Sequence, residues 1–205
     1  MSSLKATLQG AIRVGLLGLA LTMGVAMLSV PESAAQSQAY SRSVSNPGFT
    51  PTPTALLSAW STGTVPALGD DAAFNVPIGF TFTYGATQHT RVSLCSNGFL
   101  QFMGSALTAG STSFSNAALG TNGSPDTIIA GCWDDLVPTA ADTIYYGVVG
   151  APPFRVFVAR WNAIPLITSG ARTTFEIRLT ETANSVEIAS GAMQNLGTWS
   201  YTSGM

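Results

Sequence analysis

The chain has 205 residues, a formal net charge of −2, and 9% charged against 46% hydrophobic residues. That length holds one ordinary domain plus a targeting segment. Residues 36–205 contain six arginines, no lysine and nine acidic residues. A weakly acidic chain of this kind lacks the cations that neutralise a phosphate backbone, so nucleic acid is excluded as an expected partner.

The N-terminus has the order of regions found in a secretory signal peptide. Lys5 and Arg13 precede an apolar run from Val14 to Val30, and small residues at 33–35 follow. We expect cleavage after Ala35, which makes residues 1–35 a signal peptide and places the mature protein outside the cytoplasm, secreted or at the cell surface. The alternative is an uncleaved membrane anchor, for which the run is short. After cleavage no further segment is apolar enough to span a membrane.

The mature chain is predicted to be one all-β domain. Residues 36–55 are polar and contain Pro47, Pro51 and Pro53, which indicates an extended leader. Residues 56–205 alternate apolar and polar positions over short runs bounded by turn residues, which predicts an antiparallel, jelly-roll-like β-sandwich of about ten short strands. The expected strands are Leu56–Trp60, Phe74–Ile78, Phe80–Tyr84, Arg91–Ser96, Phe99–Met103, Thr127–Trp133, Thr143–Val149, Phe154–Trp161, Thr173–Thr180 and Ser185–Ala189.

Two connections in this pattern are informative. Asn97-Gly98 lies between two expected strands and predicts a two-residue type I′ turn, in which both residues have positive φ. Residues 104–126 form a long segment of small residues, and loops of that length are often functional or disordered.

Cys95 and Cys132 are the two cysteines, and both follow the signal peptide. An even number in an oxidising compartment predicts one disulfide. Each also lies in an apolar run, where a free cysteine packs as a small hydrophobic residue, so buried thiols are the alternative.

Two acidic pairs, Asp70-Asp71 and Asp134-Asp135, are the weak candidates for a metal site, because Ca²⁺ prefers carboxylate oxygens. The calcium-loop spacing of acidic residues is missing, and aspartate pairs also form turns, so we expect no cofactor. Glu176 and Arg178 alternate along one wet strand face, where a cross-strand ion pair is the simpler explanation than catalysis. His89 is the single histidine and is expected in an exposed turn. We predict no catalytic residues.

Aromatic residues are the candidates for ligand contact. Trp133 and Trp161 lie within apolar strands and are expected in the core. Tyr145 and Tyr146 are adjacent, so one of them must face outward and is a candidate for contacting a ligand.

Five motifs follow one another in a fixed order over about residues 69–190, at residues 69–85, 92–102, 128–136, 144–165 and 173–188. The chain resembles a β-sandwich domain of secreted bacterial surface proteins with SNGF and WDDL motifs, and is more distantly similar to the nidogen-type extracellular domain of animals. The resemblance implies an exported, non-catalytic module and implies nothing about its ligand. Cys95 and Cys132 depart from the family pattern, and a closing strand is hard to see in 191–205.

These observations predict an adhesive, structural or extracellular-matrix module whose partner is an extracellular protein or glycan. A carbohydrate-binding module is the alternative, and a secreted glycan hydrolase is the third possibility. A groove lined by aromatic residues favours the second, and two facing carboxylates in a cleft favour the third.

Overall fold

The structure is a computed structural model that describes Ser43 and residues 48–64, 67–104, 107–167, 169–191 and 201–205. The predicted signal peptide, residues 1–35, lies outside the described residues, and so does the first part of the predicted leader. The chain divides into two units, Met1–Ser37 and Gln38–Met205, and all of the described residues belong to the second. Within the described part no helix is long and apolar enough to cross a membrane.

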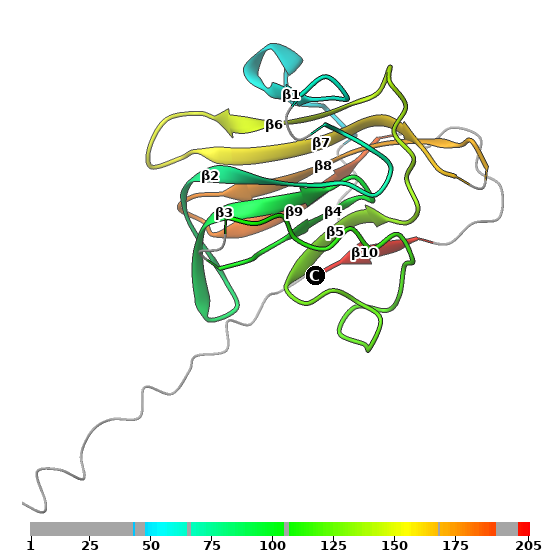
Figure 1. The fold of residues 1–205 in the computed structure, drawn as a ribbon. Helices are drawn as coiled ribbons and strands as arrows, with labels where there is room; N and C mark the ends of the chain where they lie inside the picture. The colour runs from blue at the N-terminus through cyan, green and yellow to red at the C-terminus, as the bar shows by residue number, and fades with distance from the viewer. Residues whose placement is uncertain (1–42, 44–47, 65–66, 105–106, 168, 192–200) are drawn as a thin grey trace, which may run out of the picture. The chain divides into compact units, whose positions relative to one another are not determined.

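Ten strands and one short 3₁₀ helix make up the described structure (Figure 1). The chain forms β1 at the edge of one sheet, then the whole run β2–β5 of the other, then β6–β9 beside β1, and finally β10 beside β5. The elements are η1 (Thr54–Leu56), β1 (Ser58–Trp60), β2 (Ala73–Tyr84), β3 (Thr87–Cys95), β4 (Phe99–Gln101), β5 (Ile128–Trp133), β6 (Thr143–Val149), β7 (Val156–Pro165), β8 (Arg172–Thr180), β9 (Ser185–Ser190) and β10 (Thr202–Gly204).

The strands form two five-stranded antiparallel sheets, which confirms the predicted β-sandwich. Sheet A has the order β1-β6-β7-β8-β9 and sheet B the order β10-β5-β4-β3-β2. In each sheet four strands that are consecutive in the chain lie side by side, which is the arrangement of a β-meander. A strand from the other end of the domain then pairs with the edge of each meander.

Apolar side chains of both sheets form one core between them. Phe175 of β8 stacks on Trp161 of β7 with ring centroids 4.7 Å apart. Sheet B makes room for this pair at Gly131 of β5, since a Cβ there would lie 2.3 Å from the Phe175 ring. Burying each such large apolar side chain contributes roughly 1.5–3 kcal/mol.

Several observed strands differ from the expected ones. The two strands expected at 74–78 and 80–84 are one continuous strand, β2, whose register with β3 shifts between Pro77 and Phe82. β7 begins at Val156, so Phe154 lies in the preceding turn with 72% of its surface exposed and not on a strand face. β10 is the closing strand that the sequence did not reveal, and it pairs with β5.

The turn between β3 and β4 is not the predicted type I′ turn. Cys95 pairs directly with Phe99, so the loop has three residues, and of these only Gly98 has a positive φ. The Gly98 N–H donates to the Cys95 carbonyl at 3.2 Å. A turn followed by glycine in the left-handed region is the usual three-residue hairpin loop, so the Asn-Gly signal located the hairpin correctly but assigned the wrong turn type.

Candidate functional site

The β3–β4 turn, Ser96-Asn97-Gly98, joins three segments that are far apart in the sequence. The Ser96 hydroxyl accepts a hydrogen bond from the Ala72 N–H at 2.9 Å and donates to the Asp70 carbonyl. The Ser96 N–H also donates to the Ala72 carbonyl at 2.8 Å. These bonds fix the Asp70-Asp71 turn against the start of the hairpin.

Asn97 is fully buried and uses both ends of its amide. Its Nδ2 donates to Asp71 Oδ1 at 2.7 Å and to the Thr112 carbonyl at 3.1 Å. Its Oδ1 accepts from the Leu136 N–H at 2.9 Å. One side chain thus connects the first acidic pair, the loop after β4 and the segment that follows β5.

Gly98 is needed here for space as well as for conformation. A Cβ at this position would lie 2.0 Å from the Cys132 carbonyl oxygen. The Gly98 carbonyl accepts from both Gly131 and Cys132 N–H groups, which is the pattern of a β-bulge. The motif that the sequence singled out, Ser-Asn-Gly, is therefore structural, since all three of its residues hold this end of the sandwich together.

The same end carries three carboxylates. Oxygens of Asp70, Asp71 and Asp135 lie within 4.8 Å of one another, which brings the two predicted acidic pairs together. Desolvation and the neighbouring Asp71 raise the pKa of Asp70, while desolvation and all three neighbouring aspartates raise that of Asp135. Asp134 is not part of this group, and its Oδ1 accepts from the Asp135 N–H at 2.9 Å.

The arrangement resembles part of a hard-cation site in its ligand chemistry. Asp70 and Asp71 are exposed, however, and the Asp71 carboxylate is already bound by Asn97. Of the four aspartates that the sequence marked as calcium candidates, Asp71 and Asp134 have carboxylates that accept hydrogen bonds within the protein, and calcium binding stays a hypothesis.

The predicted disulfide is not formed: Cys95 and Cys132 are both free and buried. Cys95 belongs to a small cluster with Phe99, its partner in β4, whereas Cys132 belongs to the core between the sheets. The bulge opposite Gly98 turns the Cys132 side chain toward the core between the sheets. Burial raises the pKa of each thiol to about 12, so both are unreactive packing residues.

His89 is not in an exposed turn as expected. It lies within β3 with 4% of its surface exposed, and its ring is 4.8 Å from that of Phe102. Burial lowers its pKa, against the opposing effect of a hydrogen bond with the Gly104 backbone. The strand that contains it begins at Thr87 and not at Arg91 as predicted, because β2 continues past its register shift to pair with it.

The aromatic candidates are divided between the two faces of sheet A. Tyr146 packs against the core and meets Phe74 edge to face at 5.7 Å. Tyr145 faces outward, where the Arg160 guanidinium lies 5.9 Å from its ring centroid. Trp133 and Trp161 are fully buried as predicted.

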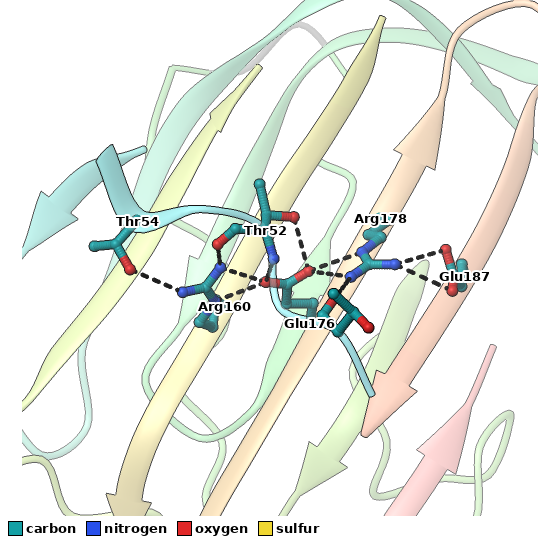
Figure 2. Close-up of polar contacts among 7 residues, drawn as sticks. Thr52, Thr54, Arg160, Glu176, Arg178 and Glu187 are labelled. Carbon is teal, nitrogen blue, oxygen red and sulfur yellow. Dashed lines mark hydrogen bonds and ion pairs between the residues drawn. The ribbon is translucent and has the colours of Figure 1, made fainter. Parts of the chain in front are cut away.

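The outer face of sheet A carries a set of charged residues that the sequence did not connect with the leader. We call Arg160, Glu176, Arg178 and Glu187 the charged row, and residues 48–54 the strap. Figure 2 shows the strap crossing this row. Glu176 is fully buried there, although the alternation of β8 predicted a wet face.

Glu176 is held by both arginines and by the strap. Arg160 and Arg178 each pair with it, at 2.6 Å and 2.7 Å. Desolvation raises the pKa of Glu176, but the arginines and the Thr52 N–H outweigh it and the pKa is lowered. The expected cross-strand ion pair is confirmed, between Arg160 and Glu176 and again between Arg178 and Glu187.

Comparisons with known proteins identify the family of this chain. A family model described as NIDO related matches residues 39–205, which include the strap and both sheets. Searches among curated proteins and among solved structures gave no match. The match covers most of the chain. The chain belongs to the nidogen-related family of extracellular domains.

Proposed function

We propose that this domain is an exported, non-catalytic module with an adhesive, structural or extracellular-matrix role, and that its partner is an extracellular protein or glycan. The observation that carries the proposal is the nidogen-related match over residues 39–205, because that family is one of extracellular domains. Function is inferred from family and surface, since the fold alone supports many activities.

The disposition of polar and aromatic groups supports this role over the alternatives. Trp60, Trp133 and Trp161 are fully buried, so these rings are unavailable as a sugar-stacking platform. Glu176 is neutralised by two arginines and Glu181 by Arg155, so neither is placed as a raised-pKa acid of the kind a glycan hydrolase uses.

The test is binding without turnover. The mature protein, immobilised, is screened against extracellular proteins and glycans, and in parallel incubated with glycan, ester and peptide substrates. We expect saturable binding to at least one surface component and no turnover. Turnover that is abolished by Asp134→Asn or Glu176→Gln would overturn the non-catalytic role, and binding confined to free sugars would favour the carbohydrate-binding module.

We also propose that the module works without a resident cofactor. If the protein bound a cation, the carboxylates of Asp70, Asp71 and Asp135 would be its ligands. Calcium is added to the metal-free protein while its melting temperature is followed. We expect calcium to shift the melting temperature of the wild-type protein no more than it shifts that of the Asp135→Asn variant. A calcium-dependent rise in melting temperature that this variant abolishes would contradict the proposal.

A further inference from the structure

The strap is held on sheet A by hydrogen bonds from its own backbone and from two of its side chains. The Thr52 N–H donates to Glu176 Oε1 at 2.8 Å, and the Thr52 carbonyl accepts from Arg160. The Thr50 carbonyl accepts from Arg178 Nη2 at 2.8 Å. Two threonine hydroxyls add to this: Thr52 Oγ1 donates to Glu176 Oε2 at 3.0 Å, and Thr54 Oγ1 accepts from Arg160 at 3.1 Å.

The alternation of threonine and proline in the strap matches the order of charges beneath it. Pro51 and Pro53 have no N–H, so every residue from 50 to 54 offers a carbonyl but only the threonines offer a donor. The charged row presents one carboxylate between two guanidinium groups. It can therefore bind an extended segment that has one donor flanked by acceptors, and charge-assisted bonds of this kind are about twice as strong as neutral ones.

The strap can leave without breaking a sheet. It precedes β1, and the hydrogen bonds that hold it run to side chains rather than to a strand ladder (Figure 2). Its departure would uncover Glu176, which is 0% exposed, and Arg160, which is 3% exposed. The uncovered charges would then bond to water, and a segment of the same chemistry can replace that water with charge-assisted hydrogen bonds.

We propose that the charged row is an exchangeable peptide site whose partner in trans is the strap of a second copy of this chain. The segment known to fit the row is present in every copy, and exchange of an identical segment creates no new kind of contact. In one molecule the strap has an effective concentration of about millimolar. The protein is therefore monomeric when dilute and exchanges straps when its local concentration approaches that value.

The experiment uses two full-length mature variants that are each defective in one half of the contact. Thr52→Pro removes the strap's N–H and hydroxyl but leaves the row intact. Glu176→Gln removes the carboxylate of the row but leaves the strap intact. Native mass spectrometry, with one variant labelled with ¹⁵N, should show monomers for each alone and a heterodimer in the mixture.

The matched control is the double variant Thr52→Pro/Glu176→Gln mixed with Glu176→Gln. This pair has straps but no intact row, so we expect no heterodimer. Equal heterodimer in both mixtures, or none in the first mixture at protein concentrations approaching about a millimolar, would overturn the proposal.

Since Glu176→Gln removes a buried charge and can fail to fold, a second measurement uses Thr52→Pro alone. A synthetic peptide of residues 48–54 is titrated into this variant and followed by the amide resonances of β8. We expect saturable binding that weakens by about tenfold or more when the peptide is N-methylated at Thr52, and that is little changed by N-methylation at Thr50.

The two methylated peptides decide the outcome. Equal binding of both, or no binding of the unmodified peptide, would overturn the exchange site. Equal binding of an unrelated extended peptide would overturn the second copy as its specific partner. The result does not depend on the adhesive role, because the strap and row can exchange whatever the module binds.

Discussion

The outer faces of the two sheets are covered in the same manner but with different chemistry. On sheet A the strap lies over the charged row, and the Thr52 N–H donates to Glu176 Oε1 at 2.8 Å. On sheet B the loop after β4 is held by neutral side chains, and the Ser111 N–H donates to Gln101 Oε1 at 2.7 Å. The two bonds differ mainly in whether the acceptor is a carboxylate or an amide.

The other contacts of the loop and of the strap show the same difference between neutral and charged partners. The loop on sheet B also accepts from Asn75 and from the Trp133 indole, and it packs on an apolar cluster that contains Cys95 and Phe99. The strap on sheet A has one apolar anchor at Phe49, which lies against Gly191. Sheet B therefore keeps its cover by packing and neutral hydrogen bonds, whereas sheet A keeps its cover by charge.

This comparison implies that the two covers respond differently to their surroundings. Neutral bonds over an apolar cluster change little with pH, while ionic bonds depend on the protonation of one carboxylate. It also explains why an extended, proline-containing leader forms part of the folded domain.

The largest expected effect comes from removing the centre of the charged row. Glu176→Ala leaves Arg160 buried without its partner and the Thr52 N–H without its acceptor, so we expect a loss of about 3–5 kcal/mol in the free energy of unfolding. Urea denaturation measures it. Glu187→Ala is the matched control in the same row: its side chain is 58% exposed, and we expect about 0–1 kcal/mol. Equal losses would show that burial does not distinguish the two carboxylates.

A smaller effect is expected on sheet B. Trp133→Phe replaces the fully buried indole with a smaller phenyl ring and removes the N–H that donates to the Ser113 carbonyl at 2.9 Å. The unfolding free energy should fall by about 1–3 kcal/mol, because buried packing is lost and a part-buried acceptor is left unpaired. The loss should be the same at pH 4 and pH 7. A loss that disappears at acid pH would mean that this cover too depends on charge.

The smallest effect concerns the clustered carboxylates at the end of the sandwich that carries the β3–β4 turn. Asp135→Asn removes one of three clustered negative charges, and the raised pKa of Asp135 shows that its charged form is disfavoured. We expect a rise in melting temperature at neutral pH on the order of a degree or two. The rise should shrink as pH falls through the raised folded pKa of Asp135. It should vanish below the unfolded pKa of about 3.9, where the wild-type carboxyl is protonated in both states. Destabilisation at neutral pH would instead assign Asp135 a favourable structural contact.

The sequence predicted the parts of this molecule that depend on short-range pattern. Alternation located the strands of the meanders, and β6 has the predicted bounds, because one-sided burial sets a period of two. The same pattern missed β10, a three-residue strand whose existence depends on pairing with β5. It also misplaced Phe154, because residues in a turn can continue an apolar alternation without being part of the strand.

The candidate sites were harder to predict because they depend on which segments meet. The acidic pairs were recognised, but their approach to each other depends on Asn97, which was interpreted only as a turn residue. The predicted disulfide is absent from the structure because β4 separates the strands of Cys95 and Cys132, and because a bulge turns Cys132 to the other side of the sheet. Alternation reveals neither the strand order nor a bulge. Burial of Glu176 required the strap, and the one signal for the strap was the alternation of threonine and proline.

The central claim is that charge holds the strap and neutral bonds hold the loop. It is tested most directly by the hydrogen-exchange protection factors of the Thr52 and Ser111 amides as pH is lowered from 7. The pKa of Glu176 is lowered in the folded state, so its stabilising contribution is complete above its unfolded pKa of about 4.3 and is lost as pH falls through the folded value. We predict that protection of Thr52 falls over that range while protection of Ser111 is unchanged. Parallel loss at both amides, or an unprotected Thr52 at pH 7, would contradict the account.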